Sequence, residues 1–346
     1  MIVLMSDLGT NELVRARSLW LLADELGWHL DVYGPCTGGI WPPLAGTDFA
    51  ACCRKGSPSV AEAASADVMV AVKPTRTALG RALRLGSATG TRVVLDVDEP
   101  PLDRLVSPRV TTLVERVSGV VSRRYHPAEV ARVRLAARSL PRTVSNPALQ
   151  RNADDRVIPH VQRPLPPGRQ HHGSRLSVGF VGTARAFKGI AGLRDAVRCT
   201  QGAKLVVTDW PPDDASQHER WLGQLSMQEA QAVLDELDVA VIPSDATPFS
   251  AGQLPMKLID AMRAGRAVVA SDLPPIRWAL GDAGLLVEPG DSDALAAALR
   301  SLIDPDVRRD LGERARRRAL ASFTPEVVAP RWATLLEDVI ATGTRR

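Results

Sequence analysis

Aromatic residues and cysteines are scarce in this sequence. The first shortage argues against a nucleic-acid-binding protein, and the second argues against a disulfide-rich one. Aromatic side chains make up only 4% of the 346 residues and are not interleaved with basic ones. Nucleic acid is therefore a poor candidate for a ligand. The four cysteines show neither metal-ligand nor CxxC spacing and are too few for a disulfide framework (Cys36, Cys52, Cys53 and Cys199). We therefore expect a reducing compartment, with the cytoplasm as the default.

Long apolar runs and a large net charge are also missing. No run approaches the roughly 18 residues of a membrane-spanning helix, and residues 1–5 are too short, and lack the basic flank, for a signal sequence. The net charge is only +4, and the excess lies in residues 1–160, with 20 Lys and Arg against 16 Asp and Glu. It could steer an anionic acceptor or a peripheral contact with a membrane surface. A solvated arginine-rich helix face is the plainer interpretation.

Apolar runs of strand length alternate with amphipathic helical stretches along most of the chain. A length of 346 residues favours two domains, and the alternation indicates βαβ units with parallel sheets. In the first half we expect strands at 2–5, 29–33, 68–72, 92–97, 117–122 and 143–145, and helices at 13–26 and 76–85. In the second half we expect strands at 177–181, 204–208, 239–243, 267–271 and 285–287, and helices at 190–198, 227–234, 255–264, 293–303, 307–321 and 325–341.

A stretch rich in proline and glycine separates the two halves. It runs from Pro159 to Ser174 with almost no apolar periodicity, which is typical of a linker. We therefore predict one α/β domain over residues 1–160, a linker over 161–175, and a second α/β domain over 176–324. A cleft between the carboxyl ends of two parallel sheets is the expected ligand site, because loops and helix N-termini converge there.

The first chemical signal lies in residues 178–189, where a strand leads through a short loop into a helix. Amide groups at the helix N-terminus, together with Arg185 and Lys188, favour binding of a diphosphate. The stretch is not a Walker A loop, because no Ser or Thr follows Lys188-Gly189. The spacing of Gly179 and Gly182 does not give the dinucleotide fingerprint either. A basic surface loop is the alternative interpretation.

The second signal lies in residues 241–271, where a strand, a polar loop and a helix beginning near Pro255 follow one another. Lys257 and Asp260 are three residues apart, so they share a helix face near its N-terminus. A carboxylate at that position can accept hydrogen bonds from the hydroxyls of a ribose. The alternative is that Lys257 forms an ion pair with Asp260 and that neither meets a ligand.

Taken together, these motifs resemble the retaining glycosyltransferases of family 4 (glycosyltransferase group 1). The resemblance rests on Gly182…Lys188-Gly189, on Ile242-Pro243-Ser244, on the Pro-x-Lys-Leu-x-Asp-x-Met pattern from Pro255, and on the segment 285–291. It implies a GT-B fold, in which two Rossmann-like parallel-sheet domains face each other across a cleft and the last helix (325–346) packs back on the first domain. The implied reaction is transfer of a sugar from a nucleoside diphosphate to a small-molecule, glycan or lipid-linked acceptor. Retention of configuration and independence from metals and other cofactors are also implied.

Residue by residue, the resemblance places Lys188 as the diphosphate lysine, Asp260 as the ribose acid and Gly223 near the nucleobase. Thr183 stands where the family often has an arginine, so we assign that task to Arg185. Gly252 stands where the family often has a first acid, so donor contacts would come from backbone amides nearby. The donor-side candidates are Gly182, Thr183, Lys188, Gly223, Leu225, Ser250, Gly252, Gln253, Leu254, Lys257 and Asp260.

The first half would supply the acceptor side of the cleft. Asp96, Asp98 and Glu99 follow the apolar run 92–95, at the end of the strand expected there, and Lys73 ends the neighbouring strand. We expect acceptor recognition there, with Asp98 assisting catalysis alongside Lys188 and Arg185; a strand end bonded to nearby arginines is the alternative. The remaining acceptor-side candidates are Gly9 and Thr10.

Two other classes of protein stay open at this point. A non-catalytic nucleotide-sugar sensor or partner subunit with the same fold would tolerate Gly252 and the shorter acid at 260. A two-domain enzyme acting on sugar phosphates or nucleotides, such as an epimerase, would share the layout. The sequence is compatible with a monomer and with a dimer.

Overall fold

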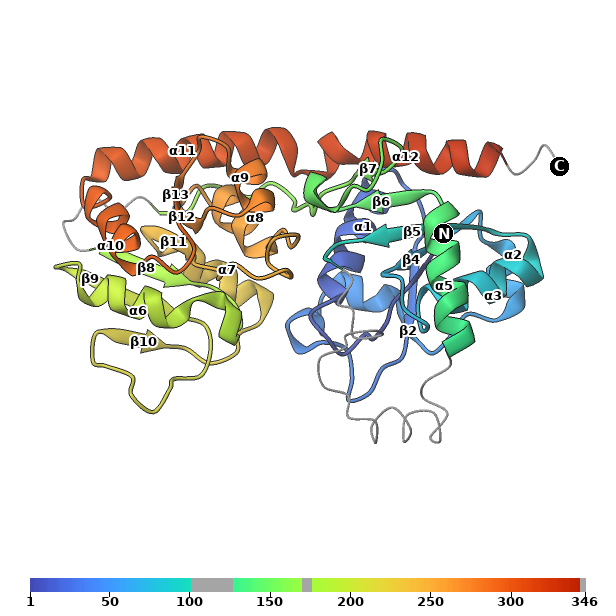
Figure 1. Ribbon diagram of the computed structural model, residues 1–346, viewed down its shortest axis with the longest axis horizontal. Coiled ribbons are helices and arrows are strands. Elements are labelled where there is room, and N and C mark those ends of the chain that lie inside the picture. The colour runs from blue at the N-terminus through green and yellow to red at the C-terminus, as the bar shows by residue number, and fades with distance from the viewer. Residues whose placement is uncertain (101–126, 170–175, 343–346) are drawn as a thin grey trace.

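The protein folds into two α/β domains that lie side by side (Figure 1). The computed structural model describes residues 1–100, 127–169 and 176–342. Within them, the strands up to residue 157 form one sheet and those from residue 176 onward form another. Every described strand pair is parallel. The prediction of two Rossmann-like parallel-sheet domains is thereby confirmed.

Among the described residues, the first sheet has seven strands in the order β3-β2-β1-β4-β5-β6-β7. Its central strand β4 is buried along its whole length, so it carries an uninterrupted apolar sequence. The strands are β1 (Ile2–Leu4), β2 (Asp31–Gly34), β3 (Cys53–Lys55), β4 (Val68–Val72), β5 (Arg92–Val97), β6 (Arg142–Val144) and β7 (Arg156–Val157). The helices are α1 (Leu13–Glu25), α2 (Val60–Ser65), α3 (Leu79–Thr89) and α5 (Pro127–Ser139), with short 3₁₀ turns η1 (Pro42–Leu44), η2 (Asp48–Cys52) and η4 (Pro147–Leu149).

The second sheet has six strands in the order β10-β9-β8-β11-β12-β13. Strand β8 lies between β9 and β11, so the strand order reverses there. The carboxyl ends of the three strands lie at one edge, where several loops can contact a ligand. The strands are β8 (Leu176–Phe180), β9 (Ala203–Val207), β10 (Glu219–Trp221), β11 (Val239–Ile242), β12 (Ala267–Ser271) and β13 (Leu285–Val287). The helices are η5 (Ala186–Lys188), α6 (Ile190–Arg198), α7 (Met227–Asp235), α8 (Met256–Arg263), α9 (Pro274–Leu280), α10 (Ser292–Ser301) and α11 (Pro305–Ser322).

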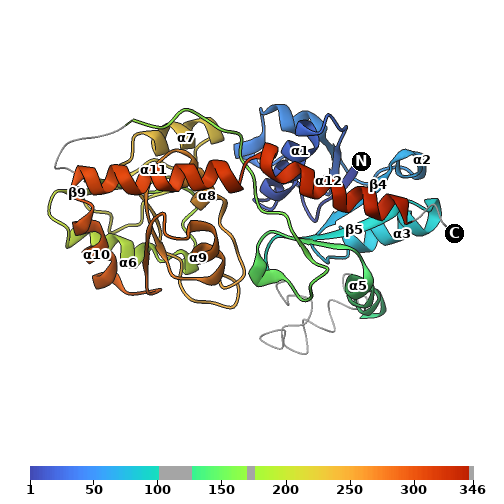
Figure 2. The ribbon, with the colours of Figure 1, turned by 90° about the horizontal axis from the view of Figure 1, so that it is seen from above.

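The last helix, α12 (Pro325–Ala341), crosses to the first domain. Figure 2 shows α11 lying over the second domain and α12 continuing over the first. Trp332 of α12 is fully buried together with Val328 and Leu336, in the same core cluster as Leu19 and Leu22 of α1. Burial of side chains this large stabilises the packing by several kcal/mol, on the order of 2 kcal/mol for each.

The segment expected to be a linker is fastened to the second domain over its described part. The amide of Gln162 donates to the Phe323 carbonyl, and that of Gly168 donates to Ala264 O. A Cβ on Gly168 would lie only 2.9 Å from the Asp235 backbone. These contacts hold residues 161–169 of the predicted linker against the second domain.

Some short elements escape prediction from the sequence. The pattern shows neither the edge strands β3, β7 and β10 nor the helices α2 and α9, because two- and three-residue strands carry too little periodicity. The strand predicted at 117–122 lies outside the described residues. Among the described helices, none is both long and apolar enough to cross a membrane.

Candidate active site

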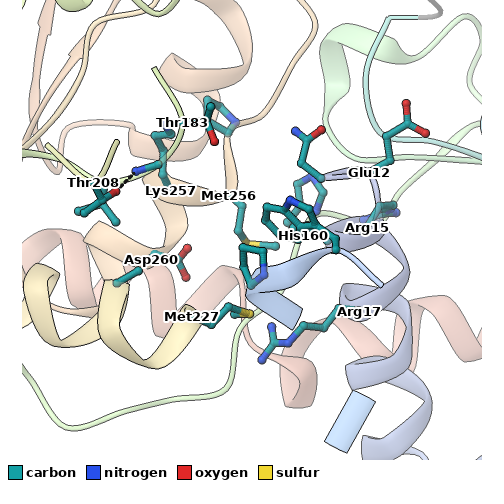
Figure 3. A pocket seen from close by; sticks show the side chains of 18 of the residues that line it. Glu12, Arg15, Arg17, His160, Thr183, Thr208, Met227, Met256, Lys257 and Asp260 are labelled. Carbon is teal, nitrogen blue, oxygen red and sulfur yellow. Dashed lines mark hydrogen bonds between the residues drawn. The ribbon is translucent and has the colours of Figure 1, made fainter. Parts of the chain in front are cut away.

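A cavity of about 280 Å³ lies between the two domains, at the edge where the strands of both sheets end. Figure 3 shows its two walls: Glu12 just before α1 with Arg15 and Arg17 of α1 on one side, and Lys257 and Asp260 of α8 on the other. Strand ends leave their loops and helix N-termini facing this space. The cavity is therefore of the kind in which parallel α/β sheets bind ligands.

Lys188 reaches this cavity from the turn η5 after β8. Its side chain is largely buried, and its Nζ donates to Gln253 Oε1 at 2.9 Å and lies 4.6 Å from the centre of the Phe187 ring. Burial and the neighbouring Arg185 lower the pKa of Lys188 to about 8, against the opposing effect of Glu99. A buried ammonium with neutral close neighbours is well placed to meet an anion.

Two glycines shape the loop that presents this lysine. Gly189 has φ of 63°, and a Cβ there would lie 1.7 Å from the Pro243 carbonyl oxygen. Gly182 has φ of 133°, and a Cβ there would lie 2.8 Å from Lys257 Nζ. Because only glycine adopts these conformations without strain, the backbone can pass close to α8. Gly182 N also donates to Thr208 Oγ1 at 2.6 Å.

Lys257 and Arg185 bring two more cations to the same wall. Lys257 Nζ lies 3.5 Å from the centre of the Phe180 ring, and burial, Lys188 and Arg185 hold the pKa of this lysine well below its usual range. Arg185 is exposed and donates to Asn11 Oδ1 across the cleft at 3.2 Å. The alternative interpretation of Lys257 as the ion-pair partner of Asp260 is wrong, because Lys257 lies against Phe180 instead.

Asp260 lies at the opposite end of this wall and contacts Gln162 of the predicted linker and Arg263 of its own helix. Its Oδ1 accepts a hydrogen bond from Gln162 Nε2 at 2.8 Å, and Arg263 Nη2 lies 3.7 Å from the same oxygen. Gln162 Oε1 in turn accepts from Arg17 at 2.8 Å. Burial raises the pKa of Asp260, while Arg263 and Arg17 lower it. A neutral amide thus donates to this carboxylate in the way that a ribose hydroxyl could.

The loop before α8 contributes less to the cavity than its sequence predicts. Gln253 and Leu254 line it, but Ser250 and Gly252 do not. Ser250 Oγ donates to the Asp245 carbonyl at 2.5 Å and so closes a turn within the loop. Gly252 is buried, and its carbonyl accepts from Asn146 Nδ2 at 2.9 Å. Both residues shape the loop rather than face the cavity.

On the first domain, Asp98 and Glu99 line the cavity as expected for the acceptor side. Asp98 is 8% exposed, and its Oδ1 has no hydrogen-bond partner among the described residues. Burial raises the pKa of Asp98 to about 7; Lys73 lowers it and Glu99 raises it further. Lys73 lies behind them with φ of 72°, bonded to Glu99 Oε1 at 2.5 Å and to Glu12 Oε1 at 2.8 Å. It therefore supports this wall rather than facing the cavity.

Asp96 is not on the acceptor side, and this corrects the sequence-based expectation. It is fully buried and accepts from Arg15 Nε at 2.8 Å, from Arg15 Nη2 at 2.7 Å and from Thr143 Oγ1 at 2.5 Å. The alternative interpretation, a strand end bonded to a nearby arginine, is therefore correct for Asp96. Gly9 and Thr10 also lie outside the cavity lining, where the next residue, Asn11, takes their place.

The candidate nucleobase end is formed by residues just after Gly223. Gly223 itself, with φ of 70°, lies against the Trp210 ring, and Leu225 lines the cavity with Gln224. Thr183 lines it from the facing loop. The structure therefore brings Leu225 and Thr183 to the cavity and leaves Gly223 beneath the exposed Trp210.

Several lining residues could not be picked out from the sequence. Arg17 lies inside a helix, and Gln162 lies in the stretch interpreted as a linker, so neither carries a motif. His160 is buried, and burial, Arg15 and Lys73 hold its pKa well below its usual range. The other unpredicted residues include Asn11, Glu12, Trp41, Thr208 and Met227.

Known sequences match the part of the chain that forms the second domain. Residues 175–305 match the family described as glycosyl transferases group 1. The phosphatidyl-myo-inositol mannosyltransferase of Mycobacterium leprae is 35% identical over 131 residues, a match covering 37% of this chain and 34% of that protein. The chain thus spans about a third of the length of the curated relatives it matches.

Solved structures extend the likeness to both domains. Sucrose-phosphate synthase from Thermosynechococcus elongatus superimposes with a TM-score of 0.70 over 99% of each chain, at 18% identity. Anabaena HepE in complex with UDP-glucose gives 0.67 over 97% of this chain and 99% of that one, at 15% identity. These similarities establish the fold. Residues 175–305 thus resemble the glycosyl transferases group 1 family, and the chain has the two-domain GT-B fold.

Proposed function

We propose that this protein is a glycosyltransferase that moves a sugar from a nucleoside diphosphate to a nucleophilic acceptor, with retention of the anomeric configuration. The observation that carries the proposal is the cluster of Lys188, Lys257 and Arg185 on one wall of the interdomain cavity. These cations face neutral groups, while Asp260 lies further along the same wall. A diphosphate and a ribose present the complementary chemistry.

The chemical difficulty is departure of the nucleoside diphosphate from an oxocarbenium-like sugar centre. Lys188 and Arg185 would stabilise the negative charge that grows on the leaving phosphate, because both cations stand at the cavity before the donor binds. With these cations in place, we propose that the reaction needs no metal ion. The same turnover in the presence of EDTA would support this part of the proposal.

The acceptor would enter from the first domain, beside Asp98 and Glu99. Asp98 Oδ1 is buried and unpartnered among the described residues, so it can accept a hydrogen bond from an acceptor hydroxyl. With a pKa near 7, this carboxylate can also hold a proton at neutral pH. We place the acceptor, whether small molecule, glycan or lipid-linked, on this side.

The test is hydrolysis of nucleotide sugars by the purified protein with and without Lys188. A thermal-shift screen with UDP, GDP, ADP and dTDP first selects the base, since a ligand of the native state raises the melting temperature. UDP-glucose is the first sugar to test, because HepE has been crystallised with it. Lys188→Ala should lower kcat by roughly 10²–10³, the usual effect of removing one preorganised donor.

Lys204→Ala is the matched control, because Lys204 is exposed on β9, away from the cavity. It should retain the wild-type rate. Full turnover by Lys188→Ala would contradict the role given to this lysine. Binding of a nucleotide sugar without hydrolysis or transfer to any acceptor would instead favour the non-catalytic sensor.

A further inference from the structure

The loop before α8 rests directly on the first domain at Gly252. Its carbonyl accepts a hydrogen bond from Asn146 Nδ2 at 2.9 Å, and a Cβ here would lie 2.4 Å from Pro100 Cγ and 3.1 Å from Leu149 Cδ2. Position 252 therefore has no room for a side chain while the domains touch. The next residue, Gln253, lines the cavity at this junction.

The side chain of Gln253 joins one charged group from each domain. Its Oε1 accepts from Lys188 Nζ at 2.9 Å, and its Nε2 donates to Glu99 Oε2 at 3.2 Å. The amide has one acceptor and one donor end, so only one orientation satisfies both neighbours. If the amide were reversed, two donors would meet at Lys188 and two acceptors at Glu99.

Glu99 is itself held in place from behind. Lys73 Nζ bonds its other oxygen at 2.5 Å and also bonds Glu12 Oε1 at 2.8 Å. Lys73 is buried, and the pKa of its ammonium is raised by Asp98, Glu99 and Glu12 in spite of burial. The carboxylate that Gln253 contacts is therefore fixed by the first domain.

Lys188 depends on this contact more than an exposed lysine would. The charged groups around it are Arg185 on its own loop, Lys257 on α8 and Glu99 on the first domain. Arg185 lowers the pKa of Lys188, whereas Glu99 raises it. Among the residues that the structure describes, the negative charge that raises the pKa of Lys188 thus comes from the opposite domain, on the far side of Gln253.

We propose that Gln253 is a positioning residue, which holds the Lys188 ammonium over the cavity and couples it to Glu99 of the first domain. The Lys188 ammonium is then held in place only while the two domains are in contact. The inference rests on the proposed function in so far as Lys188 meets the leaving phosphate. The contact between Gln253 and its two neighbours does not depend on that role.

The chain contains only five lysines, which makes Lys188 accessible to a direct titration. In nucleotide-free protein with ¹³Cε-labelled lysine, the Lys188 resonance is the one that disappears in Lys188→Ala. We expect a midpoint at about pH 8 in the wild type. Glu99→Gln should lower it by on the order of one unit, because the favourable negative charge is gone.

Gln253→Leu removes both hydrogen bonds, and the double variant tests the coupling. If Gln253 couples the two groups, Glu99→Gln should shift the Lys188 midpoint clearly less in the Gln253→Leu background than in the wild type. Equal shifts in both backgrounds would mean that Glu99 acts through space alone and would overturn the inference. Unchanged midpoints in both single variants would also overturn it.

The pH dependence of UDP binding separates this inference from the proposed function. Because ammonium is the form that meets phosphate, affinity for UDP should fall as the pH rises above about 8. Gln253→Leu should move this alkaline limb downward and weaken UDP binding at pH 8 on the order of tenfold. A Gln253→Leu effect that is equal at every pH would indicate a merely structural role and count against the inference.

Gln201→Leu is the matched control, since Gln201 is exposed in the turn between α6 and β9. It should change neither the titration nor the affinity. A wild type that binds none of the four nucleoside diphosphates would sink the proposed function. The lysine titration would still decide whether Gln253 couples the domains.

Discussion

The two walls of the cavity both carry buried cations, but they neutralise them differently. On the first domain, Arg15 pairs with Asp96, and Lys73 bonds two glutamates. On the second, the contacts of Lys188 and Lys257 are an amide oxygen and aromatic rings. On the first wall, Arg15 and Lys73 thus hold carboxylates of the same wall. On the second wall, Lys188 and Lys257 have neutral contacts and can bind an anionic ligand.

This difference has opposite consequences for stability and for binding. A buried ammonium without a carboxylate partner costs folding free energy, and the lowered pKa values of Lys188 and Lys257 express that cost. The same groups need no reorganisation when an anion arrives. A site of this kind is less stable than it could be, as functional sites often are.

Removing a paired cation should have the largest effect on the fold. In Arg15→Leu, the Asp96 carboxylate stays buried and keeps only the Thr143 hydroxyl among these partners. We expect a loss of about 3–5 kcal/mol in the free energy of unfolding, because an uncompensated charge remains in the core. Urea denaturation at pH 7 measures it.

The control for this variant is an ion pair of the same type at the surface. Arg54 lies 3.4 Å from Asp31 with half of its side chain exposed, so Arg54→Leu should change stability by less than about 1 kcal/mol. If Arg15→Leu cost no more than Arg54→Leu, the contrast between the two walls would lose its energetic basis.

A smaller effect is expected where the two walls meet. Gly252→Ala places a Cβ 2.4 Å from Pro100 Cγ, and overpacking of this kind costs about 1–3 kcal/mol. We expect lower stability and weaker UDP binding together, because the loop must withdraw from the first domain and take Gln253 with it. Urea denaturation and calorimetric titration with UDP measure the two effects.

Gly192 provides the matched glycine, because it lies within α6 and a Cβ there meets nothing closer than 3.9 Å. Gly192→Ala should be stabilising, by up to about 1 kcal/mol, since alanine favours a helix. Unchanged UDP affinity in Gly252→Ala would show that the contact at 252 does not govern the position of Gln253.

The sequence was most informative where chemistry and backbone geometry coincide. Lys188 and Asp260 could be assigned to the cavity because each follows a strand at the start of a helix, where side chains of a parallel sheet converge. The alternation of strands and helices predicted both parallel sheets, because it indicates βαβ units. Short-range patterns were sufficient for these conclusions.

The partners of these residues could not be predicted, because they come from distant parts of the chain. Nothing local indicates that Gln162 bonds Asp260, 98 residues away, or that Gln253 bonds Glu99, 154 residues away. Asp96 and Asp98 show the same limit. Alternation along a strand puts both on one face, yet one meets Arg15 in the core and the other meets the cavity.

The last effect is small and opposite in sign to those of Arg15→Leu and Gly252→Ala. Lys257→Met should raise stability at pH 7 by about 1 kcal/mol, because it removes a desolvated ammonium and a methionine sulfur can take its place against Phe180. The pKa of Lys257 is lowered in the folded state. In the window between that pKa and about 10.4, the unfolded chain binds more protons, so wild-type stability rises with pH there.

The advantage of Lys257→Met should therefore shrink as the pH approaches 10, while its affinity for UDP stays below that of the wild type. Thermal unfolding from pH 7 to 10, with and without UDP, follows both quantities in one experiment. A variant less stable than the wild type would mean that the contact of Lys257 with the Phe180 ring outweighs its desolvation. The second wall would then hold its cations for the sake of the fold, as the first wall does, and the distinction between them would rest on Lys188 alone.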